Sequence, residues 1–161
     1  MLPLRLVLHP TDFSPHSEAA AKLAFALARD YGARVLVLHV LEPIVMGGVE
    51  GVAIPDPGAY EAEMQARLEG VRPSGTEVLV EHRLLLGSIA EEILRVAKES
   101  RCGVIVLGTH GRTGLGRLLL GSVAEQVVRK APCPVLTVKA PPREAAPADA
   151  GQRRQEEPAA V

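Results

Sequence analysis

Short apolar runs alternate along this chain with longer segments whose apolar residues recur at helical spacing. Five runs rich in Leu, Val and Ile predict strands, at residues 4–9, 34–42, 76–85, 103–108 and 135–139. The second of them, RVLVLHVLE, is apolar almost throughout, which is typical of a strand buried on both faces of a parallel sheet.

Four segments between these runs predict helices, and the first has clear ends. It begins at Ser14, a favourable N-cap that is followed by Pro15, and it stops at Gly32. Its expected apolar face consists of Ala20, Leu23, Ala24, Leu27, Ala28 and Tyr31.

The other three predicted helices are 59–71, 87–100 and a last helix that precedes the prolines at 132 and 134. Capping boxes, Ser88-x-x-Glu91 and Ser122-x-x-Glu125, predict the starts of the last two. Strands that alternate with helices imply an α/β fold, in which a parallel sheet carries helices on both faces.

Composition limits the class of protein. A length of 161 residues suits one domain with a real core. Only 2% of the residues are aromatic and none is Trp, so Val, Leu, Ile and Ala must build that core, and stacking of single-stranded nucleic acid is disfavoured. The formal net charge of −1 gives no general attraction to nucleic acid or to an anionic membrane.

The composition changes at residue 140. Residues 1–140 carry all the predicted strands and helices and form the expected domain. Residues 141–161 are mainly Ala, Pro and charged residues, so we expect a disordered tail there.

The N-terminal stretch and the cysteines indicate a compartment. MLPLRLVLHP is too short in its apolar part to span a membrane and lacks the layout of a signal peptide, so we expect a cytoplasmic protein. Cys102 and Cys133 form no Cys-x-x-Cys motif and show no zinc-type spacing with His. Each is expected to be a small apolar residue near a strand, and a disulfide would be unexpected in a reducing compartment.

A glycine-rich stretch, GTHGRTGLGRLLLGS at 108–122, lies between the fourth predicted strand and the last helix. Ligands of open α/β sheets bind beyond the carboxyl ends of the strands, where the winding direction reverses. If the first strand is central, this stretch meets the segment PTDFS that follows the first strand. Its glycines would let the backbone approach a phosphate, and the N–H groups around Ser122 and Val123 would favour negative charge. Asp12 could accept hydrogen bonds from ribose hydroxyl groups, so the pairing suits a nucleotide.

Two better-known phosphate motifs are missing from the sequence. No Gly-Lys-Ser/Thr occurs in the glycine-rich stretch, and no Gly-x-Gly-x-x-Gly follows the first strand. A P-loop and a dinucleotide fingerprint are therefore excluded.

Four segments, in the same order along the chain, resemble the universal stress protein family. They are the pattern Gly108-x2-Gly111-x9-Gly121-Ser122 and the stretches HPTDFSPHS (9–17), HVLEP (39–43) and PCPVLTVK (132–139). This resemblance implies an open five-stranded parallel sheet in the order 3-2-1-4-5, similar to the Rossmann-like fold of the adenine nucleotide alpha hydrolases, usually as a dimer. Because the glycine signature is complete, it also implies the branch of the family that binds ATP.

The resemblance further implies a role for each matching residue. Asp12 would contact the ribose, and Val40 would meet adenine through its backbone. Gly108 would line the ribose side, while Pro10 and Thr11 would lie along the adenosine. The residues implied for the phosphates are Gly111, Gly121, Ser122 and Val123.

A divalent metal, Mg²⁺ or Mn²⁺, would bridge those phosphates rather than occupy a protein cage, and the Ser122 hydroxyl could join its ligands. Arg112 could clamp the phosphates or be a solvated surface residue. Asp12 could instead cap a turn, and Ser122 could be a helix cap alone. His9 and His39, which end neighbouring strands, are expected to be structural.

Three functions remain open at this stage. The first is an ATP-binding module that signals stress through partners, as a homodimer paired through the edge strand at 135–139. The second is a slow ATPase or a nucleotidyl or phosphoryl transferase, for which no base other than Asp12 is evident. The third is a non-binding structural dimer that acts through protein partners, against which the complete glycine signature argues.

Overall fold

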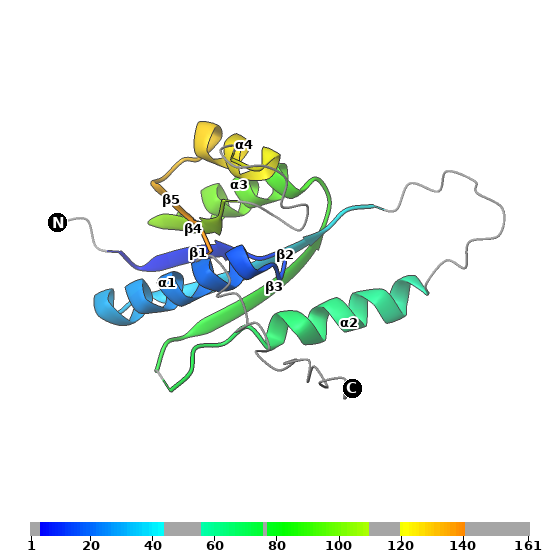
Figure 1. Ribbon diagram of the computed structural model, residues 1–161, viewed down its shortest axis with the longest axis horizontal. Coiled ribbons are helices and arrows are strands. Elements are labelled where there is room, and N and C mark those ends of the chain that lie inside the picture. Colours follow the sequence, from blue (N-terminus) through cyan, green and yellow to red (C-terminus); the bar gives the residue numbers. More distant parts are fainter. Residues whose placement is uncertain (1–3, 44–55, 76, 110–119, 141–161) are drawn as a thin grey trace, which may run out of the picture.

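The computed structural model describes residues 4–43, 56–75, 77–109 and 120–140, which form one five-stranded sheet flanked by helices (Figure 1). Neighbouring strands are all parallel, and their order is β3-β2-β1-β4-β5, which confirms the expected topology. The strands are β1 (Leu6–Pro10), β2 (Arg34–Leu41), β3 (Val80–Leu86), β4 (Val104–Gly108) and β5 (Val135–Val138).

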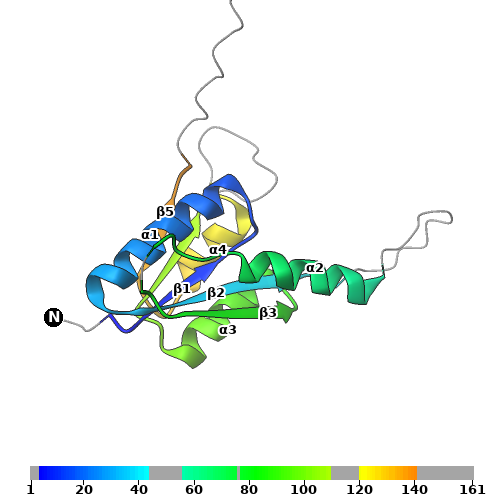
Figure 2. The ribbon, with the colours of Figure 1, turned by 90° about the horizontal axis from the view of Figure 1, so that it is seen from below.

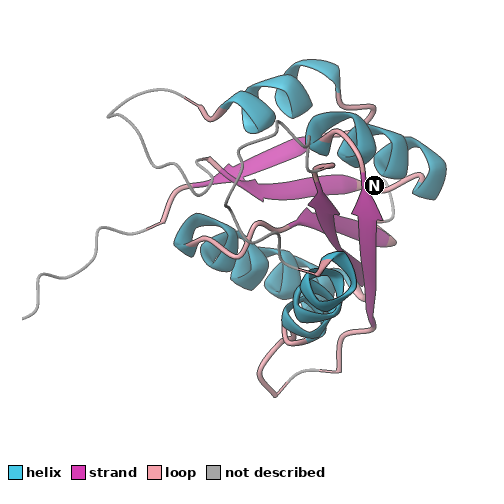
Figure 3. Cartoon of the chain, turned by 90° about the vertical axis from the view of Figure 1, so that its right-hand side faces the viewer, coloured by secondary structure: helices cyan, strands magenta, loops and turns pink. Residues whose placement is uncertain are grey.

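Helices cover both faces of the sheet (Figures 2 and 3). They are α1 (Pro15–Tyr31), α2 (Pro57–Glu69), α3 (Ile89–Ser100) and α4 (Ser122–Lys130). α1 and α2 pack on one face, and α3 and α4 pack on the other. The winding direction therefore reverses between β1 and β4. Within the described residues, no helix has both the length and the apolar character that a membrane span requires.

The two faces of the sheet have different cores. Leu8 and Leu36 face α3 and α4, whereas Val7 and Val35 face α1 and α2, as the alternation along a strand requires. α1 presents mainly alanines to this valine face: Ala20, Ala21, Ala24 and Ala28. Small side chains on the helix let its backbone lie close to the sheet.

The predicted ends of α1 are correct, but its predicted apolar face is partly wrong. The Ser14 side chain accepts a hydrogen bond from the Ser17 N–H at 3.2 Å, and Gly32 closes the helix in the left-handed conformation. Leu23 and Tyr31 are exposed, with 37% and 53% of their surface accessible. Phe25 and Ala21 are buried instead, because the contact face lies about one residue further round the helix than the predicted spacing placed it.

The two predicted capping boxes do not form as expected. Ser88 is the N-cap of α3, but its side chain makes no capping hydrogen bond. The N-cap of α4 is Gly121, so Ser122 is the first residue inside that helix. The interpretation of Ser122 as a helix cap alone is therefore wrong.

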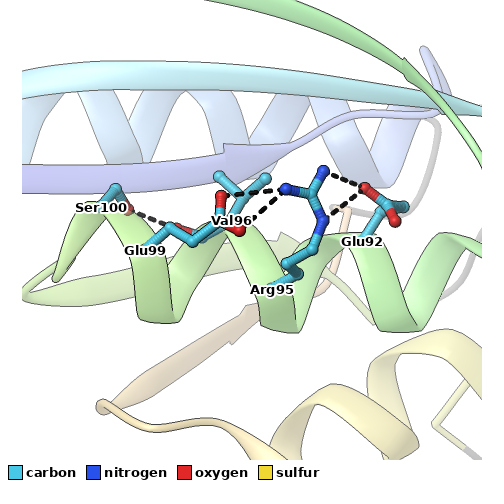
Figure 4. Close-up of polar contacts among 5 residues, drawn as sticks. All are labelled: Glu92, Arg95, Val96, Glu99 and Ser100. Atoms are coloured by element: carbon cyan, nitrogen blue, oxygen red, sulfur yellow. Dashed lines mark hydrogen bonds and ion pairs between the residues drawn. The ribbon is translucent and has the colours of Figure 1, made fainter.

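The solvent side of α3 carries a row of charged side chains (Figure 4). The Arg95 guanidinium donates through Nε to Glu92 at 3.0 Å and through Nη1 to Glu99 at 2.9 Å. Ser100 Oγ donates to the Val96 carbonyl at 2.6 Å, and the Val96 side chain is fully buried. Exposed ion pairs of this kind add little to stability, so α3 is held mainly by its buried face.

Candidate functional site

A crevice opens where the winding direction reverses, at the carboxyl ends of β1 and β4. A cavity of about 410 Å³ lies there, bordered by the first turn of α4, and a second of about 290 Å³ continues beside β2. Both cavities share Pro10, Asp12, Glu42, Ile89 and Ile93, and we call the two together the crevice. The larger cavity is within the range of about 300–1,000 Å³ that is usual for small-molecule sites.

All the predicted site residues that the structure describes line this crevice. The first cavity is bordered by Pro10, Asp12, Gly108, Gly121, Ser122 and Val123. The second adds Thr11 and Val40. Gly111 and Arg112 lie outside the described residues.

Pro10 separates β1 from β4 at the floor of the crevice. The two strands pair up to that point, with Leu8 opposite Ile105. To continue the ladder, an N–H group at position 10 would have to bond the Val106 carbonyl, and proline has none. His9 supplies a donor instead, because its Nδ1 lies 2.9 Å from that carbonyl oxygen. β1 and β4 part beyond these residues, and the crevice lies between them.

His9 is a neutral structural residue. Its side chain is completely buried, and Nε2 has no hydrogen-bond partner among the described residues. Burial lowers the pKa of His9 to about 4, although the bond to the Val106 carbonyl acts in the opposite direction. A carbonyl oxygen only accepts, so the single ring proton lies on Nδ1. His9 therefore orders β1 against β4 and has no free proton to give to a ligand.

Backbone and side-chain bonds fix the loop between β1 and α1. The Thr11 N–H donates to the Leu38 carbonyl at 2.8 Å, and His39 Nδ1 donates to the Thr11 carbonyl at 2.7 Å. Asp12 Oδ1 accepts the Ser14 N–H at 3.0 Å, so one carboxylate oxygen does form a turn. The same carboxylate lines the crevice, and no hydrogen bond from the described residues occupies its second oxygen. The two interpretations of Asp12 are thus compatible.

Val40 presents its backbone to the crevice. Along β2, backbone groups point alternately toward β1 and toward β3. The carbonyl of Leu38 points to β1, where it bonds Thr11, and the carbonyl of Leu41 points to β3, where it bonds Gly87. Val40 therefore points its N–H and C=O toward the β1 side, beyond the last paired residues of β1 and β2. Its side chain is buried in the core.

The N-terminus of α4 faces the same space. The Glu125 N–H bonds the Gly121 carbonyl at 2.9 Å, which closes the first turn. The N–H groups of Ser122, Val123 and Ala124 lie within that turn and have no acceptor in the helix. All three residues line the crevice. The positive end of the α4 dipole is therefore directed at the cavity, where it favours an anion.

The two signature glycines that the structure describes, Gly108 and Gly121, are needed for different structural reasons. A Cβ atom on Gly108 would lie 2.9 Å from the His16 Cβ and backbone, so glycine is needed there for the close approach of α1. Gly121 has φ −59° and ψ 151°, a conformation that any residue adopts. If glycine is required at position 121, the reason is the space that a side chain would take beside the backbone and not the backbone dihedral angles.

Sequence reasoning missed three residues that line both cavities: Glu42, Ile89 and Ile93. Glu42 directly follows β2, and a carboxylate at the end of a strand next to β1 was the available signal. Ile89 and Ile93 are one turn apart on α3, a spacing that by itself predicts only a core face. They give the crevice an apolar wall.

The crevice offers a metal ion no complete set of protein ligands. In the described part of the chain, no three His, Cys, Asp or Glu side chains gather where they could hold one. A cation there would need most of its ligands from a bound molecule or from water.

A larger groove of about 630 Å³ lies on the other side of the sheet, between α1 and α2. Lys22, Arg67 and Arg72 line it, and the Arg67 guanidinium lies 4.4 Å from the centre of the Phe13 ring. Size alone favours this groove, but it runs along the sides of two helices. The smaller crevice combines strand ends, a helix N-terminus and a carboxylate, so its chemistry makes it the better candidate.

Known proteins resemble this chain over most of its length. The sequence model of the Universal stress protein family matches residues 4–139. Universal stress protein MJ0531 of Methanocaldococcus jannaschii is 37% identical over 147 residues, which is 86% of this chain and 84% of that protein. The solved structure of MJ0577, a universal stress protein of the same organism, aligns with a TM-score of 0.74 at 30% identity and covers 90% of this chain and 100% of that one. The universal stress protein from Archaeoglobus fulgidus in complex with dAMP aligns with a TM-score of 0.59 at 27% identity, covering 86% and 100% of the two chains.

Proposed function

This chain belongs to the universal stress protein family, and from that premise we propose that it binds ATP in the crevice and reports nucleotide state to protein partners in a stress response. One observation carries the proposal: three separate features meet in one cavity system. They are the first-turn amides of α4, the carboxylate of Asp12 and the backbone edge of Val40.

Each part of an adenine nucleotide would meet a matching feature. The N–H and C=O of Val40 would form the donor and acceptor pair that the edge of adenine requires, and Ile89 would cover the base with apolar surface. Asp12 would accept hydrogen bonds from the ribose through its second oxygen. The N–H groups of Ser122 and Val123 would bind phosphate oxygens at the positive end of α4.

The remaining phosphate contacts are proposed from the glycine signature. Gly121 would let a phosphate lie against the backbone, and Gly111 and Arg112 would add an amide and a positive charge from the segment outside the described residues. Mg²⁺ would be held through the phosphates, with the Ser122 hydroxyl as a protein ligand. The A. fulgidus relative, which was solved with dAMP, supports an adenine nucleotide as the ligand class.

The proposed assembly is a homodimer formed through β5. This strand is an edge of the sheet, and Leu136 on it is 41% exposed. Two copies related by a two-fold axis would place their β5 strands antiparallel and extend the sheet across the interface.

Calorimetric titration of nucleotide-free protein with ATP and Mg²⁺ tests the proposal. We expect saturable binding to wild type, and at least about tenfold weaker binding to Gly121→Val, because the added side chain would occupy the phosphate position. We also expect ATP to raise the melting temperature of wild type but not of the variant.

The matched control is Gly58→Val, which makes the same substitution in the first turn of α2, outside the crevice lining. It should bind ATP as wild type does. Absence of binding to wild type, or equal binding to wild type and Gly121→Val, would reject the assignment of ATP to this crevice. Parallel titrations with ADP and AMP would define how many phosphates are recognised.

A further inference from the structure

Two cysteines that are far apart in the sequence meet at the amino-terminal ends of β4 and β5, whereas the crevice lies at the carboxyl ends of the strands. Cys102 lies just before β4, and Cys133 lies just before β5. Their Sγ atoms are 3.2 Å apart, and no disulfide joins them. β4 and β5 are adjacent, with Ile105 opposite Val135, so the two helix-to-strand turns bring the cysteines together.

The backbone holds both cysteines in this arrangement. The Cys102 N–H bonds the Ala97 carbonyl at 3.2 Å, and the next residue, Gly103, donates to the Leu6 carbonyl at 2.9 Å. Cys133 lies between Pro132 and Pro134, whose rings restrict the chain on both sides. The contact between the sulfur atoms therefore follows from the fold and not from one freely rotating side chain.

The two thiols differ in their access to solvent. Cys102 is only 5% exposed and belongs to the core under α3 and α4. Burial raises the pKa of the Cys102 thiol, and the hydrogen bond with Cys133 adds to the effect. Cys133 is half-buried, so it is the more accessible of the two residues to an oxidant in solution. A solvent-reachable thiol beside a protected one is the arrangement of an attacking and a resolving cysteine.

We propose that Cys102 and Cys133 form a redox modification site, at which a peroxide converts the thiol pair reversibly into an intramolecular disulfide. In the first step Cys133 gives its thiol proton to solvent and the thiolate attacks hydrogen peroxide. An S–O bond forms and the O–O bond breaks, which leaves Cys133 sulfenic acid, and the departing hydroxide takes up a proton from solvent to become water. In the second step the Cys102 sulfur attacks the Cys133 sulfur. The S–S bond forms, the S–O bond breaks, and the hydroxyl leaves as water with the Cys102 proton.

The balance is two thiols and one peroxide to one disulfide and two waters, with two electrons passing from sulfur to oxygen. Two equivalents of an external thiol reverse the reaction by exchange. A disulfide joins sulfur atoms about 2 Å apart, so closure requires an approach of only about 1 Å from the observed contact. The bond would link the start of β4 to the start of β5 and close a loop that contains α4.

The test uses the full-length chain and hydrogen peroxide. Reduced protein is treated with excess peroxide, the peroxide is removed with catalase, and the remaining thiols are counted by maleimide labelling and intact-mass spectrometry. We expect the loss of two hydrogens, no labelled cysteine, a Cys102–Cys133 peptide in the non-reduced digest, and full recovery with dithiothreitol. The melting temperature of the oxidised protein should rise by roughly 5–10 °C, because a closed loop restrains the unfolded chain.

Two serine variants test the order of events. Cys102→Ser should stop at the sulfenic acid on Cys133, which dimedone traps, whereas Cys133→Ser should leave Cys102 unmodified at the same peroxide dose. Two labelled cysteines in treated wild type would overturn the proposal, and so would a disulfide that joins two chains on a non-reducing gel. Because the wild-type measurement stands alone, the proposal remains testable even if a variant folds poorly. It is also independent of whether the crevice binds ATP.

Discussion

His9 replaces a backbone amide that Pro10 does not have. The imidazole donates to the Val106 carbonyl from inside the core, where no water is available to satisfy that oxygen. Burial keeps the ring neutral, and the bond to the Val106 carbonyl places its single proton on Nδ1. One side chain thus links the order of the sheet to pH.

Stability should decrease below neutral pH because of His9. Its pKa of about 4 in the folded protein is below the value of 6.5 of a free side chain, so between these values the unfolded chain takes up a proton that the folded chain does not. The effect of His9 on the free energy of unfolding does not change above pH 7. By pH 4 it has lowered that free energy by about 3 kcal/mol. Urea unfolding at pH 7, 6, 5 and 4 should show a steeper loss for wild type than for His9→Gln. Parallel pH profiles of the two proteins would contradict this account.

Gly108 should be required for the fold as well as for the crevice. The Cβ of Gly108→Ala would lie 2.9 Å from His16, so α1 would have to move away from β4, at a cost of about 1–3 kcal/mol. Thermal unfolding without nucleotide should show a lower melting temperature. Gly58→Ala is the control, since its Cβ would meet only Asp56 at 3.6 Å and alanine suits a helix better than glycine. Equal melting temperatures for Gly108→Ala and wild type would show that α1 adjusts freely.

At the residue scale, the sequence predicted which residues line the crevice better than it predicted the packing contacts that those residues make. Asp12 and Gly108 both line the crevice, as their places after β1 and at the end of β4 indicated. The clash that demands Gly108 could not be predicted, because it depends on how closely an alanine-rich helix packs. Glu42 was missed although it follows a strand next to β1, because its position does not by itself indicate which side chains lie beside it.

At the scale of the element, hydrophobic runs predicted every strand and helix that the structure describes, but their ends less well. The predicted strand at 76–85 is observed as Val80–Leu86, and the predicted helix at 59–71 as Pro57–Glu69. Ser88 shows what a capping pattern leaves open: the pattern placed the start of α3 correctly, while tertiary packing decides whether the side chain forms the capping hydrogen bond. The partly wrong face of α1 has the same origin, because many Ala positions leave the contact face undetermined.

Elements far apart in the sequence build the crevice together. β1, β2, β4, α3 and α4 each contribute to its lining. The strand order could be stated in advance only from the resemblance to a family, since the order of strands in a parallel sheet is not encoded in the pattern of any single segment. Gly111, one of the three signature glycines, lies in the segment 110–119, which is outside the described residues.

At the scale of the whole molecule, the open edge of β5 makes the dimer testable. The Thr109 N–H bonds the Val138 carbonyl, and the Ile105 N–H bonds the Pro134 carbonyl, so even-numbered residues of this edge face β4. By alternation, Thr137 points its N–H away from the sheet. Thr137→Pro should therefore remove a donor from the dimer interface without removing one from the β4–β5 ladder.

We expect wild type to have the mass of a dimer in light scattering after size exclusion, and Thr137→Pro to shift toward the monomer by at least tenfold in the dissociation constant. Thr137→Val keeps the N–H and is the matched control. A wild-type protein that is monomeric at micromolar concentration, or a proline variant that stays dimeric, would exclude β5 as the interface.

The proline at the floor of the crevice has a consequence for how such a chain can evolve. Any other residue at position 10 would offer the Val106 carbonyl a backbone donor and let the sheet close by one further pair, which a search for stability alone would favour. Proline prevents that extra pair, and the buried His9 beside it replaces the missing backbone donor to the Val106 carbonyl. The pair is a trade-off between a tighter scaffold and an open pocket, and selection for robustness at this position would act directly against ligand access.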